Sequence, residues 1–159
     1  IAISDAPQPH VWLTKRSPRL KHHPGQVAFP GGAVDVTDLS RSDTALREAR
    51  EEIGLCSDDV QVLGCLSPYS TVTGWHITPV VGIIPHAYQF RVNPHEIDSI
   101  FAVPLSWLAD PNNLTRRPDV NPRDGSTRSV FFFRPYTGQV IWGTSARITL
   151  ELLLMTGLR

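Results

Sequence analysis

The chain has 159 residues, 41% of them hydrophobic, and its 15 Lys and Arg side chains balance its 15 Asp and Glu side chains. This length predicts one compact domain over residues 1–159 and excludes two domains of comfortable size. A formal net charge of zero and the lack of a bilayer-length apolar run disfavour nucleic-acid and membrane partners.

The two cysteines, Cys56 and Cys65, match no zinc-site spacing and make no disulfide framework. We expect them to be reduced thiols in or near the core of a cytoplasmic protein. The chain starts at Ile1 rather than Met, which leaves open that its natural N-terminal strand is truncated.

Taken in chain order, the first elements are strands. Runs rich in β-branched and aromatic residues predict strands at residues 1–3 and 11–14. A basic loop over residues 15–25 follows and leads into the turn Phe29-Pro30-Gly31-Gly32. The glycines of this turn would let the backbone approach a neighbouring element closely.

The clearest predicted helix covers residues 42–53. Its apolar residues recur at spacings of three and four, which places them on one face: Ala45, Leu46, Ala49 and Ile53. Ser40 or Ser42 is suited to cap its start, and Gly54 is suited to a left-handed cap at its end.

Apolar runs after this helix predict strands at residues 60–66, 76–84 and 97–103, followed by a short helix over residues 104–108. Residues 110–128 are rich in Pro, Asn, Asp and Arg and predict the longest loop of the chain. An ordinary surface loop is the simplest interpretation, and contacts of its arginines with a substrate or a second subunit are the alternatives.

Two further runs, residues 130–134 and 139–142, are predicted to pair as a hairpin. Thr144 is expected to cap a final helix over residues 145–155, which is apolar enough to pack on a sheet. Because the elements show no regular βαβ alternation, we predict an α+β fold in which helices sandwich a mixed sheet.

The segment richest in chemistry lies in the second half of the predicted helix. Glu48, Glu51 and Glu52 stand at positions i, i+3 and i+4, so three carboxylates share one helical face. Such like-charge pairs cost about 0.2 to 0.5 kcal/mol each in an isolated helix. A divalent cation would reverse that cost, since Mg²⁺ prefers oxygen ligands and also binds phosphate. Taken alone, a solvated charged face is the simpler interpretation.

The order of these residues resembles the Nudix signature, G-x5-E-x7-R-E-U-x-E-E-x-G-U, in which U is a bulky apolar residue. Residues 47–55 match it throughout, with Ala49 as a small residue at the first U position. Counting from Gly32, Asp38 stands at the position of the first Glu, and eight residues rather than seven separate it from Arg47. The extra residue is expected in the loop or first helical turn, where it leaves the helical carboxylates in place.

A narrower resemblance precedes the turn. Residues 12–32 are similar to the motif L-L-T-x-R-S-x3-R-x3-G-x3-F-P-G-G of the coenzyme A pyrophosphohydrolase subfamily. Trp12 replaces the first Leu, and Lys21 replaces the second Arg, which keeps the charge and loses the bidentate fork. Residues 71–84 and 141–146 are also similar to stretches of that subfamily, so the likeness covers about residues 11–155 in all.

The resemblance implies the Nudix fold and hydrolysis with Mg²⁺ or Mn²⁺ as the cofactor. Glu48 and Glu52 would be the main metal ligands, with Glu51 as a third and the carbonyl of Gly32 as a further ligand. Arg47 would orient the glutamates. The metal would screen the charge of a diphosphate and help to deprotonate the attacking water.

The subfamily resemblance implies a small-molecule nucleotide substrate, coenzyme A or a derivative, cleaved to 4′-phosphopantetheine and adenosine 3′,5′-bisphosphate. No acidic residue occurs between Asp5 and Asp35, so the basic loop is suited to the phosphates of this substrate. The residues expected to bind it are Arg16, Lys21, Phe29, Gly31 and Gly32.

Several alternatives stay open. The general base is either a glutamate of the signature or Glu96, for which an exposed loop carboxylate is an equally simple interpretation. Another nucleotide, such as ADP-ribose or NADH, is an alternative substrate. A non-catalytic binding module is the third alternative, and the complete cluster from Arg47 to Glu52 disfavours it. A homodimer is also left open.

Overall fold

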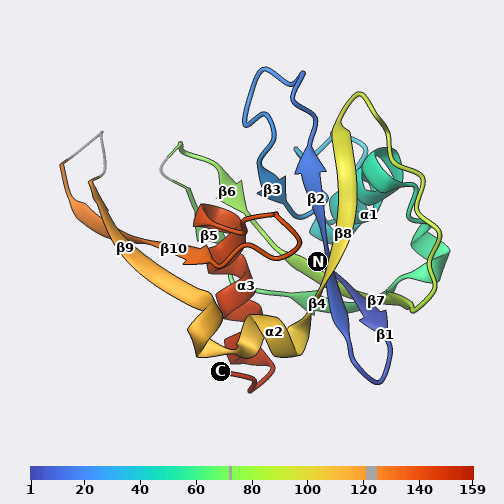
Figure 1. The fold of residues 1–159 in the computed structure, drawn as a ribbon. Helices are drawn as coiled ribbons and strands as arrows, with labels where there is room; N and C mark the ends of the chain where they lie inside the picture. Colours follow the sequence, from blue (N-terminus) through green and yellow to red (C-terminus); the bar gives the residue numbers. More distant parts are fainter. Residues whose placement is uncertain (72, 121–124) are drawn as a thin grey trace.

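A six-stranded mixed sheet forms the centre of the computed structural model, which describes residues 1–71, 73–120 and 125–159 (Figure 1). The strand order is β3-β2-β1-β7-β4, and β8 pairs with β2. β1 and β7 are parallel, and the other pairs are antiparallel. The strands are β1 (Ala2–Asp5), β2 (His10–Arg16), β3 (Val27–Ala28), β4 (Gln61–Cys65), β7 (Val80–Pro85) and β8 (Ile97–Pro104).

β2 is the strand that organises this sheet. Its whole length pairs with β8, whereas β1 pairs at Val11 and Trp12 and β3 pairs further along, at Thr14 and Lys15. Because a strand has only two hydrogen-bonding edges, β1 and β3 share one edge of β2 and β8 takes the other. The end of β2 and the start of the Gly-Gly turn are therefore held side by side.

The remaining elements lie around the sheet. The helices are α1 (Arg41–Ile53), α2 (Leu105–Ala109) and α3 (Gly143–Met155), with single 3₁₀ turns η1 (Ser57–Asp59) and η2 (Pro111–Asn113). Two small hairpins add the strands β5 (Tyr69–Ser70), β6 (His76–Ile77), β9 (Leu114–Val120) and β10 (Thr127–Phe133).

Side chains on the two faces of the sheet build two separate cores. On β2, Val11 and Leu13 belong to the core that includes residues of α3, whereas Trp12 packs against the core that includes residues of α1. This alternation follows from the two-residue period of a strand. The sheet thus lies between α1 and α3, as Figure 1 shows, and the predicted α+β sandwich is confirmed.

The predicted first helix is confirmed, although it begins at Arg41, one residue before the predicted start. Ser40 is the cap residue, since its Oγ accepts a hydrogen bond of 3.1 Å from the backbone N–H of Asp43. At the other end, Gly54 adopts the left-handed conformation with φ of 67°. A Cβ at Gly54 would also lie 2.9 Å from that of Arg91, so both conformation and packing require glycine.

The predicted loop over residues 110–128 is wrong for most of its described part. η2 and β9 occupy residues 111–120, and β9 pairs with β10 as a hairpin that projects from the body of the molecule (Figure 1). Pro118 favoured a loop, but the sheet of β9 and β10 has only two strands, where proline is tolerated at an edge. Arg123, one of the arginines of this predicted loop, lies outside the described residues.

Three smaller predictions also need correction. The predicted hairpin of residues 130–134 and 139–142 is confirmed only in part. An antiparallel bridge joins Phe132 to Trp142 and the N–H of Phe133 donates to the carbonyl of Ile141, but the main partner of β10 is β9. The predicted strand at residues 76–84 is divided into β6 and β7 around Pro79. Thr144 is no cap, because α3 already begins at Gly143 without a capping side chain.

Both cysteines are exposed, so the prediction that they lie in or near the core is wrong. Cys65 belongs to β4, the edge strand of the sheet, in which every residue is exposed. Among the residues described, no helix combines the length and apolarity that crossing a bilayer requires. The single domain, the homodimer and the cytoplasmic location stay predictions.

Candidate active site

The Gly-Gly turn reaches α1 because β3 is fixed to β2. The two short strands pair at Thr14–Ala28 and Lys15–Val27, and the Thr14 hydroxyl donates a further hydrogen bond of 3.0 Å to the carbonyl of Ala28. Phe29, the next residue, packs against the core on the α3 side. These contacts direct the following glycines toward the face of α1 that carries the glutamates.

Glu52 is the buried carboxylate of the cluster, with only 3% of its surface exposed. Its Oε2 accepts a hydrogen bond of 3.1 Å from the backbone N–H of Gly31. Burial, with a smaller contribution from the negative charges of Glu48 and Glu96, raises the pKa of Glu52 to about 7, against the lowering effects of Gly31 and Arg16. A buried carboxylate of this kind favours a bound proton or a cation.

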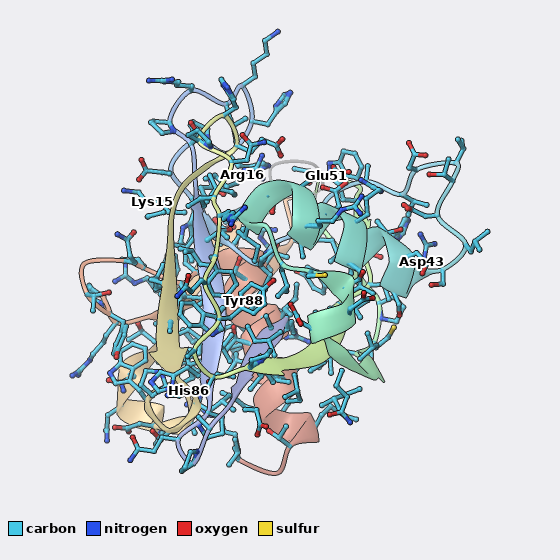
Figure 2. The ribbon with its side chains drawn as sticks, turned by 90° about the vertical axis from the view of Figure 1, so that its right-hand side faces the viewer. Lys15, Arg16, Asp43, Glu51, His86 and Tyr88 are labelled. Atoms are coloured by element: carbon cyan, nitrogen blue, oxygen red, sulfur yellow. The ribbon has the colours of Figure 1, made fainter. Side chains whose placement is uncertain are left out.

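Arg16, at the end of β2, lies next to this carboxylate. Its Nη1 is 4.0 Å from Oε1 of Glu52, and Figure 2 shows it beside the C-terminal half of α1, away from Asp43. Its Nε is buried and has no hydrogen-bond partner among the described residues. Arg16 therefore keeps donor capacity close to the carboxylate, and an anionic ligand would use it. Lys21, by contrast, is exposed in the loop between β2 and β3.

Glu48 lies against the second glycine of the turn. A Cβ built on Gly32 would overlap the carboxylate of Glu48, so only glycine leaves room for this side chain in its present position. The side chain of Glu48 is 14% exposed, and its Oε1 accepts a hydrogen bond of 2.8 Å from Arg47. The two carboxylates nearest the turn are thus Glu48 and Glu52.

Arg47 holds the outer side of this cluster together. Its Nε and Nη2 each donate a hydrogen bond of 3.0 Å to the carboxylate of Asp38, and Nη2 also donates to the carbonyl of Ala33 at 2.9 Å. Its Nη1 contacts Glu48 at 2.8 Å and Glu51 at 3.4 Å. This bidentate and branched arrangement is specific to a guanidinium group.

Asp38 therefore binds Arg47, although its side chain is shorter than that of the signature Glu and the loop has an extra residue. Its carboxylate also accepts hydrogen bonds of 2.8 Å from the Thr44 hydroxyl and from the backbone N–H of Asp35. The pairing with Arg47, followed by these two donors, holds the pKa of Asp38 well below its usual range. Sequence comparison left the role of Asp38 open because the loop conformation decides whether its carboxylate reaches Arg47.

Glu51 differs from the other two glutamates in its surroundings. Its side chain is 49% exposed, and its Oε2 lies 3.4 Å from Nη1 of Arg47. In the part of the chain that the structure describes, no three His, Cys, Asp or Glu side chains are grouped closely enough to hold a metal ion together. The structure brings Glu48 and Glu52 to the Gly-Gly turn and leaves Glu51 with Arg47.

Comparison with known proteins identifies this arrangement. Residues 1–123 match the family model of the NUDIX domain. The chain belongs to the Nudix family. It is 44% identical over 164 residues to the uncharacterized Nudix hydrolase NudL of Escherichia coli (strain K12), covering 100% of this chain and 81% of that protein. NudL of Klebsiella pneumoniae (strain 342) is 42% identical over 160 residues, with the same coverage.

Solved Nudix structures share the fold at lower identity. The Nudix hydrolase RenU of M. smegmatis has a TM-score of 0.58 and 24% identity, covering 69% of this chain and 70% of that one. A C. elegans Ap4A hydrolase has a TM-score of 0.57 and 15% identity, covering 66% and 76%. A MutT/nudix family protein from Enterococcus faecalis has a TM-score of 0.59 and 14% identity, covering 98% and 60%.

The chain is therefore a Nudix hydrolase, an enzyme that cleaves nucleoside diphosphates linked to another group, and α1 is its Nudix helix. Nudix hydrolases generally use divalent metal ions. The residues at the turn fit such an ion, because they offer only oxygen ligands, one carboxylate is buried, and the lack of a Cβ at Gly32 lets the Glu48 carboxylate lie against the turn.

Glu96 lies close to this site along the chain segment that precedes β8. It is half-buried and directly precedes β8. Asn93 links it to the Nudix helix, since the N–H of Asn93 donates to the carbonyl of Glu52 at 2.8 Å and its Nδ2 donates to the carboxylate of Glu96 at 3.1 Å. The backbone carbonyl of Glu96 accepts a hydrogen bond of 2.8 Å from the N–H of Ser17, one residue beyond Arg16. The structure thus brings Glu96 to the signature glutamates, although it is far from them in the sequence.

Tyr88 supports the end of the Nudix helix, a role that sequence reasoning missed. Its hydroxyl donates to the carbonyl of Gly54 at 3.2 Å and accepts from the N–H of Cys56 at 2.8 Å. Its ring packs on Phe90, which in turn packs on Trp12 with ring centroids 4.7 Å apart (Figure 2 labels Tyr88). These contacts fix the end of the Nudix helix, and no motif in the sequence signals them.

Proposed function

We propose that this Nudix hydrolase cleaves the diphosphate bond of coenzyme A or a derivative, giving 4′-phosphopantetheine and adenosine 3′,5′-bisphosphate. One observation carries the proposal: the two ends of the subfamily motif lie on either side of Glu52. Arg16 from its first half is 4.0 Å from this carboxylate, and the N–H of Gly31 from its last half is 3.1 Å away. A motif folded around a catalytic carboxylate is expected to bind the group being cleaved.

The metal ligands proposed are Glu48 and Glu52, with the carbonyl of Gly32 beside them. When bound, Mg²⁺ or Mn²⁺ neutralises charge on the diphosphate and lowers the pKa of the attacking water. Glu51 is the proposed third ligand, and it must leave its contact of 3.4 Å with Arg47 to reach the ion. Arg47 orients the cluster through its bonds to Asp38 and Glu48.

The substrate phosphates are proposed to meet the basic end of β2. Arg16 offers a guanidinium group whose Nε has no hydrogen-bond partner among the described residues. Lys21 is exposed in the adjoining loop, where it is free to contact the additional 3′-phosphate of coenzyme A. Phe29, Gly31 and Gly32 shape the turn between these residues and the Nudix helix.

Glu96 is the proposed general base, which takes a proton from the attacking water. Three features support this role: Glu96 is half-buried, it lies near Glu52, and its carboxylate is not engaged in an ion pair among the described residues. Glu48 and Glu51, by comparison, both contact Arg47. A base left with an available oxygen is suited to accept a proton.

The test is a substrate panel. The protein is incubated with coenzyme A, ADP-ribose or NADH and with Mg²⁺ or Mn²⁺, while products are followed by chromatography. We expect adenosine 3′,5′-bisphosphate from coenzyme A and the highest kcat/KM for that substrate. If coenzyme A gives no product with any divalent metal, the proposal is wrong.

A further inference from the structure

The turn that carries Glu96 is fixed at both ends. Before the turn, the N–H of Asn93 donates to the carbonyl of Glu52 at 2.8 Å, and the N–H of Arg91 donates to the carbonyl of Ile53 at 2.9 Å. After it, the carbonyl of Glu96 accepts from Ser17 at 2.8 Å. Figure 1 shows the segment between β7 and β8 running beside α1. The backbone of Glu96 is therefore tied to the Nudix helix and to the end of β2.

The side chain of Asn93 connects this turn to the carboxylate of Glu96. Its Nδ2 donates a hydrogen bond of 3.1 Å to Oε1 of Glu96, and its Oδ1 accepts a hydrogen bond of 3.1 Å from the N–H of His95. The two bonds determine the orientation of the amide, because only its oxygen can accept from a backbone N–H. The amide nitrogen is thereby directed at Glu96.

The sequence around Asn93 favours a rigid turn. Pro94 restricts Asn93 to extended backbone and presets its own φ for a turn. The N–H groups of Glu96 and Ile97 then both donate to the carbonyl of Asn93, at 3.1 and 2.8 Å. One residue thus bonds to the backbone of Glu52 and to the side chain of Glu96.

We infer that Asn93 is a positioning residue, which holds one carboxylate oxygen of Glu96 so that the other oxygen faces the attacking water. This inference rests on the proposed role of Glu96 as general base. A carboxylate beside Glu52 is repelled by it and would otherwise turn toward solvent. Restricting the base to a productive orientation raises the rate of proton transfer without adding binding energy for the substrate.

The test replaces Asn93→Asp. This variant keeps an oxygen that accepts from His95 and keeps the backbone bond to Glu52, but it presents a second carboxylate to Glu96 in place of a donor. We expect kcat to fall roughly ten- to a hundredfold, as for other residues that orient a catalytic group. KM for the substrate and the half-saturating Mg²⁺ concentration are expected to stay within about twofold of wild type. A kcat within about twofold of wild type would overturn the inference.

A matched control separates positioning from general damage. Asn113 also donates through Nδ2, to the carbonyl of Trp107 at 2.9 Å, in a turn after α2. Asn113→Asp removes the same kind of bond away from the site and is expected to leave kcat unchanged. Thermal unfolding of both variants shows whether either loses the fold. Equal losses of kcat in the two variants would also overturn the inference.

The decisive measurement is a double-mutant cycle. Glu96→Gln is expected to lower kcat by roughly 10², and adding Asn93→Asp should lower it further by less than about twofold, because Asn93 acts only through Glu96. Independent, multiplying effects would refute positioning. Near-normal kcat for Glu96→Gln would show that Glu96 is not the general base and that Asn93 does not position it, while the proposed hydrolytic function would stand. If the wild-type protein hydrolyses no nucleoside diphosphate derivative, the proposed function is wrong as well.

Discussion

Glu51 and Glu52 are adjacent in the sequence and are treated alike by the Nudix signature, but the structure gives them opposite surroundings. Glu52 is 3% exposed and contacts the Gly-Gly turn, whereas the side chain of Glu51 is 49% exposed and contacts Arg47. Burial raises the pKa of Glu52 to about 7. The comparison shows that position on the helix, rather than residue type, separates a proposed principal ligand from an accessory one.

The largest effect is expected from replacing these two glutamates in turn. Glu52→Gln keeps the hydrogen-bond acceptor for Gly31 and removes the charge, so we expect kcat to fall by roughly two or more orders of magnitude. Glu51→Gln should lower kcat by about tenfold or less, because Glu48 and Glu52 remain. Steady-state kinetics at saturating Mg²⁺ measures both. Equal losses would contradict the separation of the two positions.

A second test displaces the Glu48 carboxylate without changing any glutamate. Gly32→Ala places a methyl group where the Glu48 carboxylate lies, and the flexible side chain must move away. A misplacement of this size costs up to roughly 10² in rate. The backbone is expected to accept the change, since the overlap involves only the end of a side chain. Unaltered activity together with an unaltered melting temperature would show that Glu48 has no fixed role.

A smaller loss of activity is expected when the contact between Asp38 and Arg47 is removed. Asp38→Ala removes two hydrogen bonds to Arg47, which then holds Glu48 and Glu51 with less restraint. We expect a loss of roughly tenfold in kcat/KM, as is usual for residues that orient metal ligands. Asp38→Glu restores the signature residue in a loop that is one residue longer. Activity of Asp38→Glu equal to that of Asp38→Ala would show that the loop, rather than the carboxylate alone, sets this contact.

The Nudix helix and the contacts around its glutamates differ in how far the sequence predicts them. The helix and its caps follow from local spacing, so they were predictable. The exposure of each glutamate depends on which element packs against it, and the packing of the Gly-Gly turn on α1 is set by the pairing of β2 with β3. Such non-local pairing leaves no local pattern in the sequence.

The same limit explains the errors elsewhere in the chain. Residues 114–120 contain Pro118 and lack an alternating apolar pattern, yet they form β9 because β10 offers a partner. Cys65 was expected near the core, but β4 lies at the edge of the sheet. Neither outcome can be derived from local composition, since both depend on the order of strands in space.

The raised pKa of Glu52 also predicts that the stability of the metal-free protein depends on pH. This effect is smaller than the effects on activity. The unfolded chain binds this proton with the ordinary pKa of 4.5, and the folded chain binds it with a pKa of about 7. Between these values the folded state holds more protons, so the free energy of unfolding falls as pH rises and stays low above about pH 7. Glu52→Gln removes this dependence and leaves Gly31 a hydrogen-bond acceptor.

In EDTA, Glu52→Gln should therefore melt a few degrees above wild type near pH 8, with the difference shrinking toward about pH 5. Thermal unfolding followed by circular dichroism measures this. Added Mg²⁺ should reduce the advantage at the higher pH, because only the wild-type carboxylate gains from binding the ion. Glu51→Gln is the matched control, and its melting temperature is expected to follow wild type at both pH values. A difference between Glu52→Gln and wild type that is independent of pH would mean that the buried carboxylate keeps its ordinary pKa.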